Sequence, residues 1–443
     1  MIMLFTLAAL SACDGESFYY GDNNVKNSVE ETTSTVAPTS AEPVVYEDVV
    51  ALLNNYTEKA FPKDESKNAT YKAAYDNFAF NFLKTVTDAD KDKNVCLSPF
   101  SAYMAFSLCF MGADNETLEE FENVFGLSKT DAAKYCQALY AELLQTKYYD
   151  NDTKVNVANS VWVDNGYAQY VKEDYLKNAT EYFNAPVYRG DFKAQETVDA
   201  LNDWCSEQTD GLIKEIIKEF GEYQVMALVN ALLIEAGWEE SYSDYEVKKD
   251  VFTNNDMTKT QVDFLCRTTD FCYRGEDSNA FKIPLKDGFS FVGILPNEDV
   301  SIDEYLSSLT AEKFNALLSK PDYNCGANTR IPKFNIDYNV NLVGVMMEMG
   351  ITAAFDDVVA DFRLMGEKPG ENLYIGSALQ KTHFELDEKG IKAAAVTYIG
   401  MNSKGAVSGP REIIDIFLDR PFIYALMDDA TGLPLFIGTI KEL

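Results

Sequence analysis

Helix-like segments come first along this chain, and most strand-like segments follow them. Within residues 70–443, apolar side chains recur at three- and four-residue spacing mainly in the first half, and strand patterns gather in the second. A regular alternation of strands and helices, which indicates a parallel α/β sheet, does not occur. Neither a linker-like break nor an internal repeat interrupts the stretch. The order therefore predicts the α+β class and a single domain over residues 67–443.

Several predicted helices have recognisable ends. Ser98 can cap a helix with Pro99 in its first turn, and Gly112 is placed to end that helix. Gly350 ends a later helix in the same way, because glycine accepts the left-handed conformation that often follows a helix. The expected helices begin near Tyr71 and at Ser98, and further ones span residues 117–125, 197–218 and 342–349.

Strands are predicted from apolar runs and from alternation. Residues 225–234 are almost continuously apolar, which indicates a strand buried on both faces. The other expected strands are residues 156–163, 289–295, 330–337, 383–386, 413–418 and 433–439.

Histidine occurs once, at His383, and this excludes most catalytic arrangements. A Ser-His-Asp or Cys-His site would have only this candidate base, which lies in a strand-like run. The chain contains no GxSxG, HExxH or P-loop motif. An acidic run at residues 88–94 lacks the glycine and the glutamate that a calcium loop requires. We therefore expect no metal, no cofactor and no enzymatic activity.

The eight cysteines are scattered singly, without CxxC pairs, so a structural zinc site is not expected. Cys96 and Cys109 lie in apolar runs and are expected to be buried. Cys266 and Cys272 could form a bridge, although spacing alone does not establish a disulfide.

The formal net charge is -33 and the sequence pI is about 4.3. A chain this acidic repels nucleic-acid phosphates and anionic membranes and attracts basic partners over long range. Such charge also keeps an exposed protein soluble.

The amino-terminal residues 1–12 are apolar, are too short to span a bilayer as a helix, and end in Leu-Ser-Ala before Cys13. They resemble the end of a lipoprotein leader that is cleaved before Cys13 and leaves lipid on its thiol. The absence of Lys and Arg from the segment also fits a truncated leader or a plain secretory one. Residues 13–66 are rich in polar residues and are expected to be a flexible tether. Both features predict an extracellular protein, either secreted or held at the membrane only through a lipid anchor.

Several blocks of sequence form a recognisable series along the chain. They are NVCLSPFS at 94–101, FNA at 183–185, DF at 191–192, LNDW to TDGLI at 201–213, LVNA at 228–231 with Gly237 and Trp238, IPKF at 331–334, DEKG at 387–390 with AAAVT at 393–397, DRPF at 419–422 and LFIG at 435–438. In these blocks and in their order the chain resembles the serpins, a family of serine protease inhibitors.

The resemblance implies a metastable fold with three β-sheets, about nine helices and an exposed reactive-centre loop. A member of this family is a suicide inhibitor and is expected to act as a monomer. Its target serine protease cleaves the loop and is held as a covalent acyl-enzyme. The first half of the loop then inserts into the large sheet as a new strand. Here the inserted segment would be residues 390–403.

The hinge of that loop can be tested against strand geometry. Side chains alternate faces along a strand, so one face of the inserted hinge would be free of charge, and Lys392 would lie on the other face. A charge on the buried face would have to be desolvated at considerable cost. Gly390 supplies backbone freedom, and Ile391 is bulkier than the residue usual in the family. The hinge residues are Glu388, Gly390, Ile391, Ala393, Ala394, Ala395, Val396 and Thr397.

Family spacing from Glu388 gives Lys404–Gly405 as the cleaved bond. Lysine suits a trypsin-like protease, whose specificity pocket contains a carboxylate. The segment before Pro421 is long for the family, so Arg411 is an alternative. Met401, Ala406 and Val407 are residues that elastase-like or subtilisin-like proteases accept.

Two control regions also follow from the resemblance. The shutter, a hydrogen-bonded cluster beneath the strands that must separate, would contain Ser98, Ser101, Asn230 and Gln380. The breach, where insertion begins, would contain Trp238, Lys333 and Glu388, with an ion pair between the last two. His383 is then expected to be an ordinary strand residue. Alternative functions are a non-inhibitory binding or carrier protein and an inhibitor of cysteine proteases.

Overall fold

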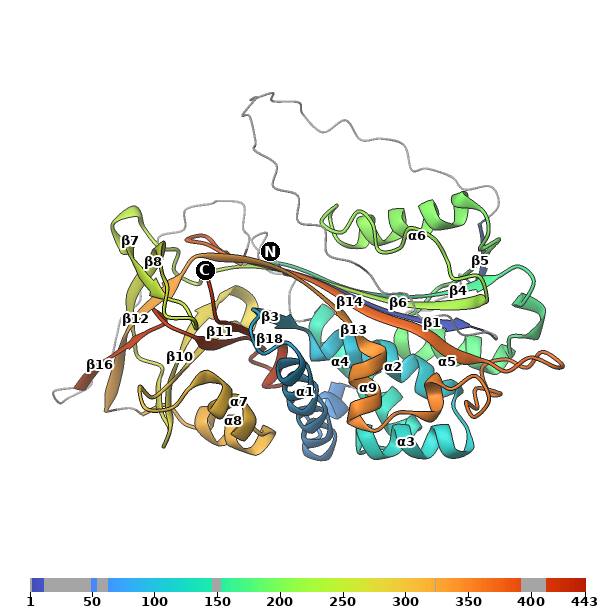
Figure 1. Cartoon of the computed structure of the whole chain (residues 1–443), viewed down its shortest axis with the longest axis horizontal. Helices are drawn as coiled ribbons and strands as arrows, with labels where there is room; N and C mark the ends of the chain where they lie inside the picture. Colours follow the sequence, from blue (N-terminus) through green and yellow to red (C-terminus); the bar gives the residue numbers. More distant parts are fainter. Residues whose placement is uncertain (1, 12–48, 54–62, 146–152, 323, 392–411) are drawn as a thin grey trace, which may run out of the picture.

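The computed structural model describes residues 2–11, 49–53, 63–145, 153–322, 324–391 and 412–443. Among these residues, three β-sheets form the framework, with eight, six and four strands. Within the described residues they are accompanied by nine α-helices. Figure 1 shows the largest sheet running along the molecule, with the two smaller sheets at one end. The α+β class and the three-sheet fold expected from the sequence are confirmed.

The large sheet has the strand order β13-β14-β1-β6-β4-β5-β2, and the short strand β15 also pairs with β6. Its central strand β6 is buried nearly throughout, as its apolar sequence predicts. The strands are β1 (Ile2–Ser11), β2 (Val50–Leu53), β4 (Thr153–Asp164), β5 (Val187–Gly190), β6 (Gln224–Gly237), β13 (Phe334–Asn341), β14 (Tyr374–Leu386) and β15 (Gly390–Ile391).

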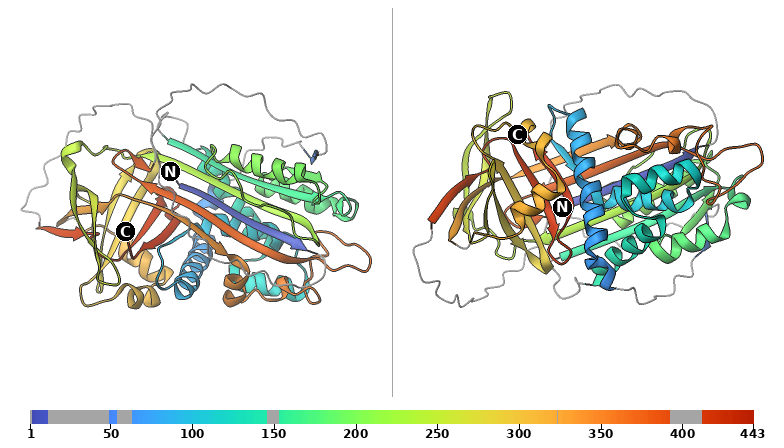
Figure 2. Two further views of the ribbon diagram at one scale, coloured as in Figure 1. Left: turned by 45° about the horizontal axis from the view of Figure 1, so that its top comes forward. Right: turned by 90° about the horizontal axis from the view of Figure 1, so that it is seen from below.

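Helices cover both faces of this sheet (Figures 1 and 2). Helix α6 packs over one face, where Leu201 and Cys205 meet Ala227 and Val229 of β6 in a small core. The other face rests on the main core, through which α2 passes with nearly all its side chains buried. The helices are α1 (Ala69–Ala89), α2 (Pro99–Gly112), α3 (Asn115–Phe125), α4 (Lys129–Gln145), α5 (Glu173–Phe183), α6 (Gln195–Gln208), α7 (Ile302–Ser308), α8 (Ala311–Leu318) and α9 (Leu342–Met349).

The smaller sheets complete the other end of the molecule. The six-stranded sheet has the order β3-β18-β17-β11-β10-β9 and the four-stranded sheet the order β16-β12-β8-β7. Their strands are β3 (Val95–Leu97), β7 (Val247–Thr253), β8 (Lys259–Thr269), β9 (Cys272–Arg274), β10 (Ser278–Leu285), β11 (Phe289–Pro296), β12 (Cys325–Pro332), β16 (Glu412–Phe417), β17 (Phe422–Asp428) and β18 (Leu433–Ile440).

The predicted helix ends are found where the sequence placed them. The Ser98 hydroxyl accepts a hydrogen bond from the Ser101 N–H at the start of α2, and Pro99 is the first residue of that helix. Gly350 ends α9 with a φ of 115°, in the region that favours glycine.

Two predicted elements have the wrong extent. The helix expected over residues 197–218 ends at Gln208, because Asp210 and Gly211 adopt positive φ values of 50° and 77°. The strand expected over residues 330–337 is two strands, β12 and β13, which belong to different sheets and meet at Lys333. Apolar alternation alone cannot show that a chain leaves one sheet for another.

The amino-terminal region differs from its expected layout in two places. Val50–Leu53, inside the stretch expected to be a tether, pairs with β5 at the edge of the large sheet. Ile2–Ser11, inside the expected leader, forms β1 and pairs antiparallel with both β6 and β14. Cleavage of the leader stays a prediction, and β1 is the part of the sheet that such cleavage would remove.

Candidate functional site

The hinge begins in a tight turn at the end of β14. Asp387 and Gly390 form a β-bridge, and the Asp387 carboxylate accepts hydrogen bonds from the backbone N–H groups of Lys389 at 2.8 Å and Gly390 at 3.3 Å. The turn sends the chain back beside β6, where Gly390 lies opposite Gly237 and Ile391 opposite Ala236. The start of the predicted hinge is therefore already paired with the large sheet.

Gly390 occupies a position that accepts no larger residue without movement of the backbone. Its φ is 138°, and an added Cβ would lie 2.5 Å from the Ala236 carbonyl oxygen and 2.6 Å from Gly237 Cα. Ile391, the bulky residue at the next position, is fully buried against the main core. The main core therefore has room for the isoleucine side chain at this position.

The breach residues surround this turn. The Trp238 indole N–H donates to the Asp387 carbonyl at 2.8 Å, and the Trp238 backbone N–H donates to the Lys389 carbonyl at 3.2 Å. Trp238 itself is completely buried. The Lys333 ammonium lies 2.6 Å from the Glu388 carboxylate, so the expected ion pair is present.

This ion pair shifts the titration of both partners. The hydrogen bond from Lys333 lowers the pKa of Glu388, and the bond to Glu388 raises the pKa of Lys333 despite partial burial. The two side chains are 32% and 33% exposed, so solvent screens much of their attraction.

Strands β15 and β1 occupy one continuous position beside β6. Ile391 lies opposite Ala236, and Ile2 lies opposite Ile234, so Glu235 is the one β6 residue between them. Strand β1 fills the position between β6 and β14 from there to the far end of β6. Both strands run antiparallel to β6.

Three of the residues predicted for the shutter, Ser98, Gln380 and Asn230, belong to two hydrogen-bonded groups. In the first, the Gln380 amide of β14 donates to the Ser98 carbonyl at 3.1 Å and accepts from the Ser98 N–H at 3.2 Å. In the second, the Asn230 amide of β6 donates to the Asn159 side chain of β4 at 2.9 Å. All four residues are buried.

Thr6 of β1 separates these two groups. It lies opposite Gln380 of β14 on one side and opposite Asn230 of β6 on the other. Asn230 Oδ1 accepts no hydrogen bond within the described part of the chain. Gln380 is thus bonded to Ser98 at the start of α2, and Asn230 is bonded to Asn159 of β4, with β1 between the two groups.

His383 is a strand residue, as expected from its sequence context. It lies in β14 with Nδ1 2.7 Å from the Asp337 carboxylate of β13. This hydrogen bond lowers the pKa of Asp337. The pair links neighbouring strands of the large sheet.

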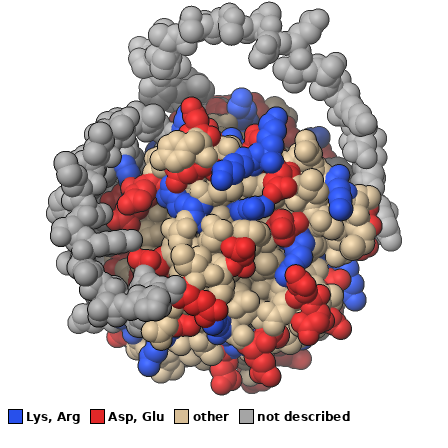
Figure 3. Space-filling view, turned by 90° about the vertical axis from the view of Figure 1, so that its left-hand side faces the viewer, with Lys and Arg blue, Asp and Glu red and all other residues tan. Residues whose placement is uncertain are grey.

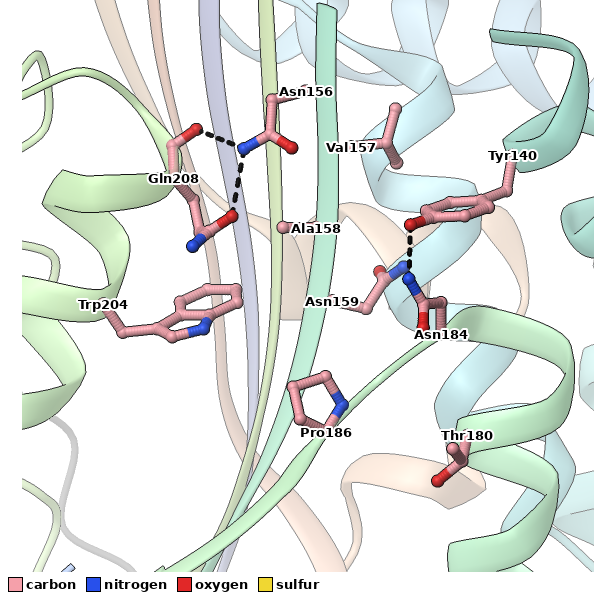
Figure 4. Close-up of a pocket in the computed structure, with 10 residues that line it drawn as sticks. All are labelled: Tyr140, Asn156, Val157, Ala158, Asn159, Thr180, Asn184, Pro186, Trp204 and Gln208. Carbon is pink, nitrogen blue, oxygen red and sulfur yellow. Dashed lines mark hydrogen bonds between the residues drawn. The ribbon is translucent and has the colours of Figure 1, made fainter. Parts of the chain in front are cut away.

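A separate pocket of about 280 Å³ opens beside β4, between α5 and α6 (Figure 4). Its polar groups bond mainly within the protein: Asn156 donates to the backbone and the side chain of Gln208, and Asn184 donates to the Tyr140 hydroxyl. No carboxylate, lysine, arginine or histidine lines it. This chemistry does not suggest catalysis, and the pocket is set apart from the hinge.

The end of the molecule that carries β7, β8 and β16 has a mixed charge. Figure 3 shows Lys and Arg side chains interspersed with Asp and Glu on this face, although the whole chain is strongly acidic. No helix in the described ranges is long and apolar enough to cross a membrane.

Several predicted site residues lie outside the described residues. They are Cys13, Ala393, Ala394, Ala395, Val396, Thr397, Lys404, Gly405 and Arg411. Two further residues were not predicted from the sequence. Asp387 accepts hydrogen bonds within the hinge turn, and Asn159 accepts a hydrogen bond from Asn230. Turn-forming chemistry in DEKG could have indicated Asp387, whereas nothing in the sequence pairs Asn159 with Asn230.

Comparison with known proteins gives the same fold. The sequence profile described as Serpin (serine protease inhibitor) matches residues 73–443. Iripin-8 of Ixodes ricinus is 29% identical over 393 residues, covering 86% of this chain and 96% of that protein. The native-state crystal structure of tengpin, a thermophilic serpin, superposes with a TM-score of 0.76 at 30% identity and covers 89% of this chain and all of that one.

The three-sheet fold and the hinge turn beside β6 thus agree with the class of protein that these comparisons define. The chain belongs to the serpin family. An uncharacterized serpin-like protein of the archaeon Methanosarcina mazei is also similar, at 26% identity over 407 residues.

Proposed function

We propose that this protein is a suicide inhibitor of extracellular serine proteases, acting by insertion of residues 390–403 into the large sheet. The observation that carries the proposal is the pairing of Gly390 and Ile391 with Gly237 and Ala236 of β6. The loop is thereby directed along the position between β6 and β14. The family of the chain, whose members include serine protease inhibitors, supports the same function.

Continuing the register of β15 gives each inserted residue a partner. Ala393 would lie opposite Ile234, Ala395 opposite Leu232 and Thr397 opposite Asn230, because partners in an antiparallel pair advance in opposite directions. Thr397 would thus take the place that Thr6 holds between Asn230 and Gln380.

The register also assigns the two faces of the inserted strand. Ile234 and Leu232 belong to the main core, whereas Ala231 and Val229 belong to the core under α6. Side chains directly opposite in a pair share a face, so Ala393 and Ala395 would enter the main core. Lys392 would lie on the other face opposite Glu235, which is half-buried, so its charge need not be fully desolvated.

Strand β1 must be absent or displaced before the loop can insert, because one position cannot hold two strands. Removal of the proposed leader, residues 1–12, would vacate it. We therefore propose that the inhibitory form begins at or near Cys13, with or without lipid on that residue, and is secreted or anchored at the cell surface.

The proposed bond for attack is Lys404–Gly405, which suits a trypsin-like protease with a carboxylate in its specificity pocket. Attack at Arg411 would suit the same class. Cleavage after Met401, Ala406 or Val407 would indicate an elastase-like or subtilisin-like target instead. Cysteine proteases are a further possible target class for the same loop.

The decisive experiment mixes the chain that begins at Cys13 with trypsin, elastase and subtilisin in separate reactions. A complex stable on a denaturing gel, with a released carboxyl-terminal peptide that starts at Gly405, supports the proposal. Clean cleavage without a complex, for every protease tried, would contradict inhibition and leave a binding or carrier role.

Two matched variants separate insertion from cleavage. In Ala393→Asp a carboxylate would have to enter the main core, so cleavage should continue while complex yield falls sharply. In Lys392→Gln the change lies one residue away on the half-exposed face, and complex yield should stay near that of the parent protein. Equal yields from both variants would contradict the proposed register.

A further inference from the structure

The thiols of Cys272 and Cys325 meet where the two smaller sheets join. Cys272 begins β9 at the edge of the six-stranded sheet, and Cys325 begins β12 in the four-stranded sheet. Their sulfur atoms are 2.8 Å apart, and both residues are fully buried. Non-bonded heavy atoms normally stay at about 3.5–4.0 Å even between carbons, which are smaller than sulfur. The two sulfurs are therefore closer than ordinary packing allows.

The backbone brings the two residues together. The Asp322 N–H donates to the Cys272 carbonyl at 2.7 Å, and the Asp322 carbonyl accepts from the Cys325 N–H at 2.9 Å. One residue thus holds both strand ends. Cys266, the partner that sequence spacing suggested for Cys272, instead directs its thiol to the Phe264 carbonyl at 3.6 Å.

The pair adjoins the strand that follows the proposed reactive loop. Cys325 lies opposite Glu412 in the parallel pairing of β12 with β16, and β16 is an edge strand held on one side only. Arg274 connects the two, donating to Cys325 Sγ at 3.2 Å and to the Glu412 carboxylate at 2.7 Å. A bond that restrains Cys325 therefore also restrains Glu412, the first residue of β16.

We propose that Cys272 and Cys325 form a disulfide that fastens the start of β12, and with it the attachment of β16, to the six-stranded sheet. Disulfides persist outside the cytoplasm, so the inference depends on the proposed export for its oxidising environment. The proposed disulfide does not depend on whether the protein inhibits proteases. From their separation of 2.8 Å the sulfurs have to move less than about 1 Å to reach the disulfide bond length of about 2.05 Å.

The chemistry is thiol–disulfide exchange with a disulfide oxidant. During folding, before the two residues are buried, the Cys325 thiol gives its proton to solvent, and the thiolate attacks one sulfur of the oxidant and expels the other as a thiolate, leaving a mixed disulfide. Cys272 then loses its proton to solvent or to the expelled thiolate, and its sulfur attacks Cys325 Sγ and expels the second thiolate. Two protein thiols are oxidised to one disulfide, and one oxidant disulfide is reduced to two thiols. Burial and the neighbouring sulfur raise the pKa of Cys272 to about 12, so its thiolate is scarce at neutral pH and the second step must include its deprotonation.

The test refolds the full chain in a mixture of oxidised and reduced glutathione, so that the oxidant reaches both thiols before they are buried, blocks remaining thiols with an alkylating agent in denaturant, and maps the peptides without reduction. The expected result is one cross-linked peptide pair containing Cys272 and Cys325, with the other cysteines alkylated. Alkylation of both residues, or a cross-link of Cys272 to Cys266, would overturn the proposal. This readout needs no variant and does not depend on protease inhibition.

A second measurement tests the fastening of β16. Reduction of the oxidised protein should lower its thermal midpoint by several degrees, and Cys272→Ser should remove that difference between oxidised and reduced protein. Cys266→Ser, a change to a nearby thiol outside the pair, should preserve it. A midpoint that does not respond to reduction in the cross-linked parent protein would overturn the fastening role.

Discussion

The Lys333 ammonium and the Glu388 carboxylate form a 2.6 Å ion pair that joins the start of β13 to the hinge turn. Glu388 lies in the turn whose backbone bonds to Trp238 and Tyr242, and its side chain reaches across to the segment between β12 and β13. The hinge turn is thus bonded through its backbone to the segment that follows β6, and through this ion pair to the start of β13.

Reversal of one charge in this pair should loosen the hinge. Glu388→Lys places two ammonium groups together, so β15 should pair less firmly with β6 and more of the protein should be cleaved without forming a complex. The stoichiometry of inhibition, measured against a protease that forms a complex, should rise. Lys389→Glu alters charge at the exposed neighbour without touching Lys333 and is the control. An unchanged stoichiometry and an unchanged proportion of inactive protein in Glu388→Lys would count against a role for the pair.

The same pair predicts a defined pH dependence of stability. Because the folded pKa of Glu388 is lowered, its contribution is full above the ordinary carboxyl value of about 4.3 and is lost as the pH falls through the lowered value. Because the folded pKa of Lys333 is raised, its contribution is full below about 10.4 and is lost only as the pH rises through the raised value. Solvent screening limits the total to about 1 kcal/mol or less.

A comparison of the parent protein with Lys333→Met/Glu388→Gln should therefore show a constant difference in unfolding free energy between about pH 5 and pH 10. The difference should shrink in stronger acid. A difference that persisted undiminished at pH 2 would show that packing, and not charge, distinguishes the two proteins.

Gly390→Ala should release the hinge from the sheet. The positive φ of 138° and the 2.5 Å approach of an added Cβ to the Ala236 carbonyl both oppose the substitution. Strain of this kind costs about 1–3 kcal/mol, and loss of the β15 pairing would relieve it. Hydrogen exchange at the Gly390 and Ile391 amides should accelerate.

The matched control for that variant is Gly344→Ala in α9. An added Cβ there meets no atom within 4 Å, and the residue is exposed in a helix. Alanine should stabilise the protein by about 0.5–1 kcal/mol, because it is the better helix former. If both substitutions had the same effect, the special backbone demand at Gly390 would be refuted.

Gln380→Met should destabilise the shutter. Methionine has a similar shape but cannot accept the 3.2 Å hydrogen bond from the buried Ser98 N–H. An unpaired buried donor costs about 1–3 kcal/mol. Urea unfolding should report a loss of this size.

Gln137→Met in α4 is the corresponding control. Its amide also donates to a carbonyl, that of Glu181, but at an exposed site where water can replace the bond. Its loss should be within about 0.5 kcal/mol. Equal losses from both variants would show that burial of the Gln380 contact has no special weight.

The parts of the fold that the sequence predicted are those set by local physics. The Ser98 cap, the Gly350 terminator and the apolar strand β6 each depend on residues close together in the chain. The predicted bounds of helices and strands are wrong where contacts between residues far apart in the sequence determine the structure. Gly211 is a stop signal of the same kind as Gly350, but the apolar side chains continue at helical spacing beyond it, and this pattern extended the predicted helix past its end at Gln208.

Only part of the candidate site could be predicted, because most of its contacts also join residues that are far apart in the sequence. The Lys333–Glu388 pair and the Ser98–Gln380 contact join residues far apart in sequence, and they were placed through family resemblance and not through local pattern. The role of Asp387 follows from ordinary turn chemistry. The pairing of β1 with β6 and β14 was not predicted, because an apolar amino-terminal segment has the same composition whether it is a leader or a strand.

Removal of β1 should decide whether the sheet can accept the loop. The chain that begins at Cys13 lacks the strand between β6 and β14, so it should form covalent complexes, whereas the full chain should be cleaved with little complex. A synthetic peptide with the sequence of residues 2–11 should bind the shorter chain and suppress its complex formation, because it restores the pairing on both sides. A scrambled peptide of the same composition is the control. If the full chain inhibited as well as the shorter one, β1 would have to leave the sheet readily. If the peptide had no effect on the shorter chain, the vacated position would not be the one that the loop requires.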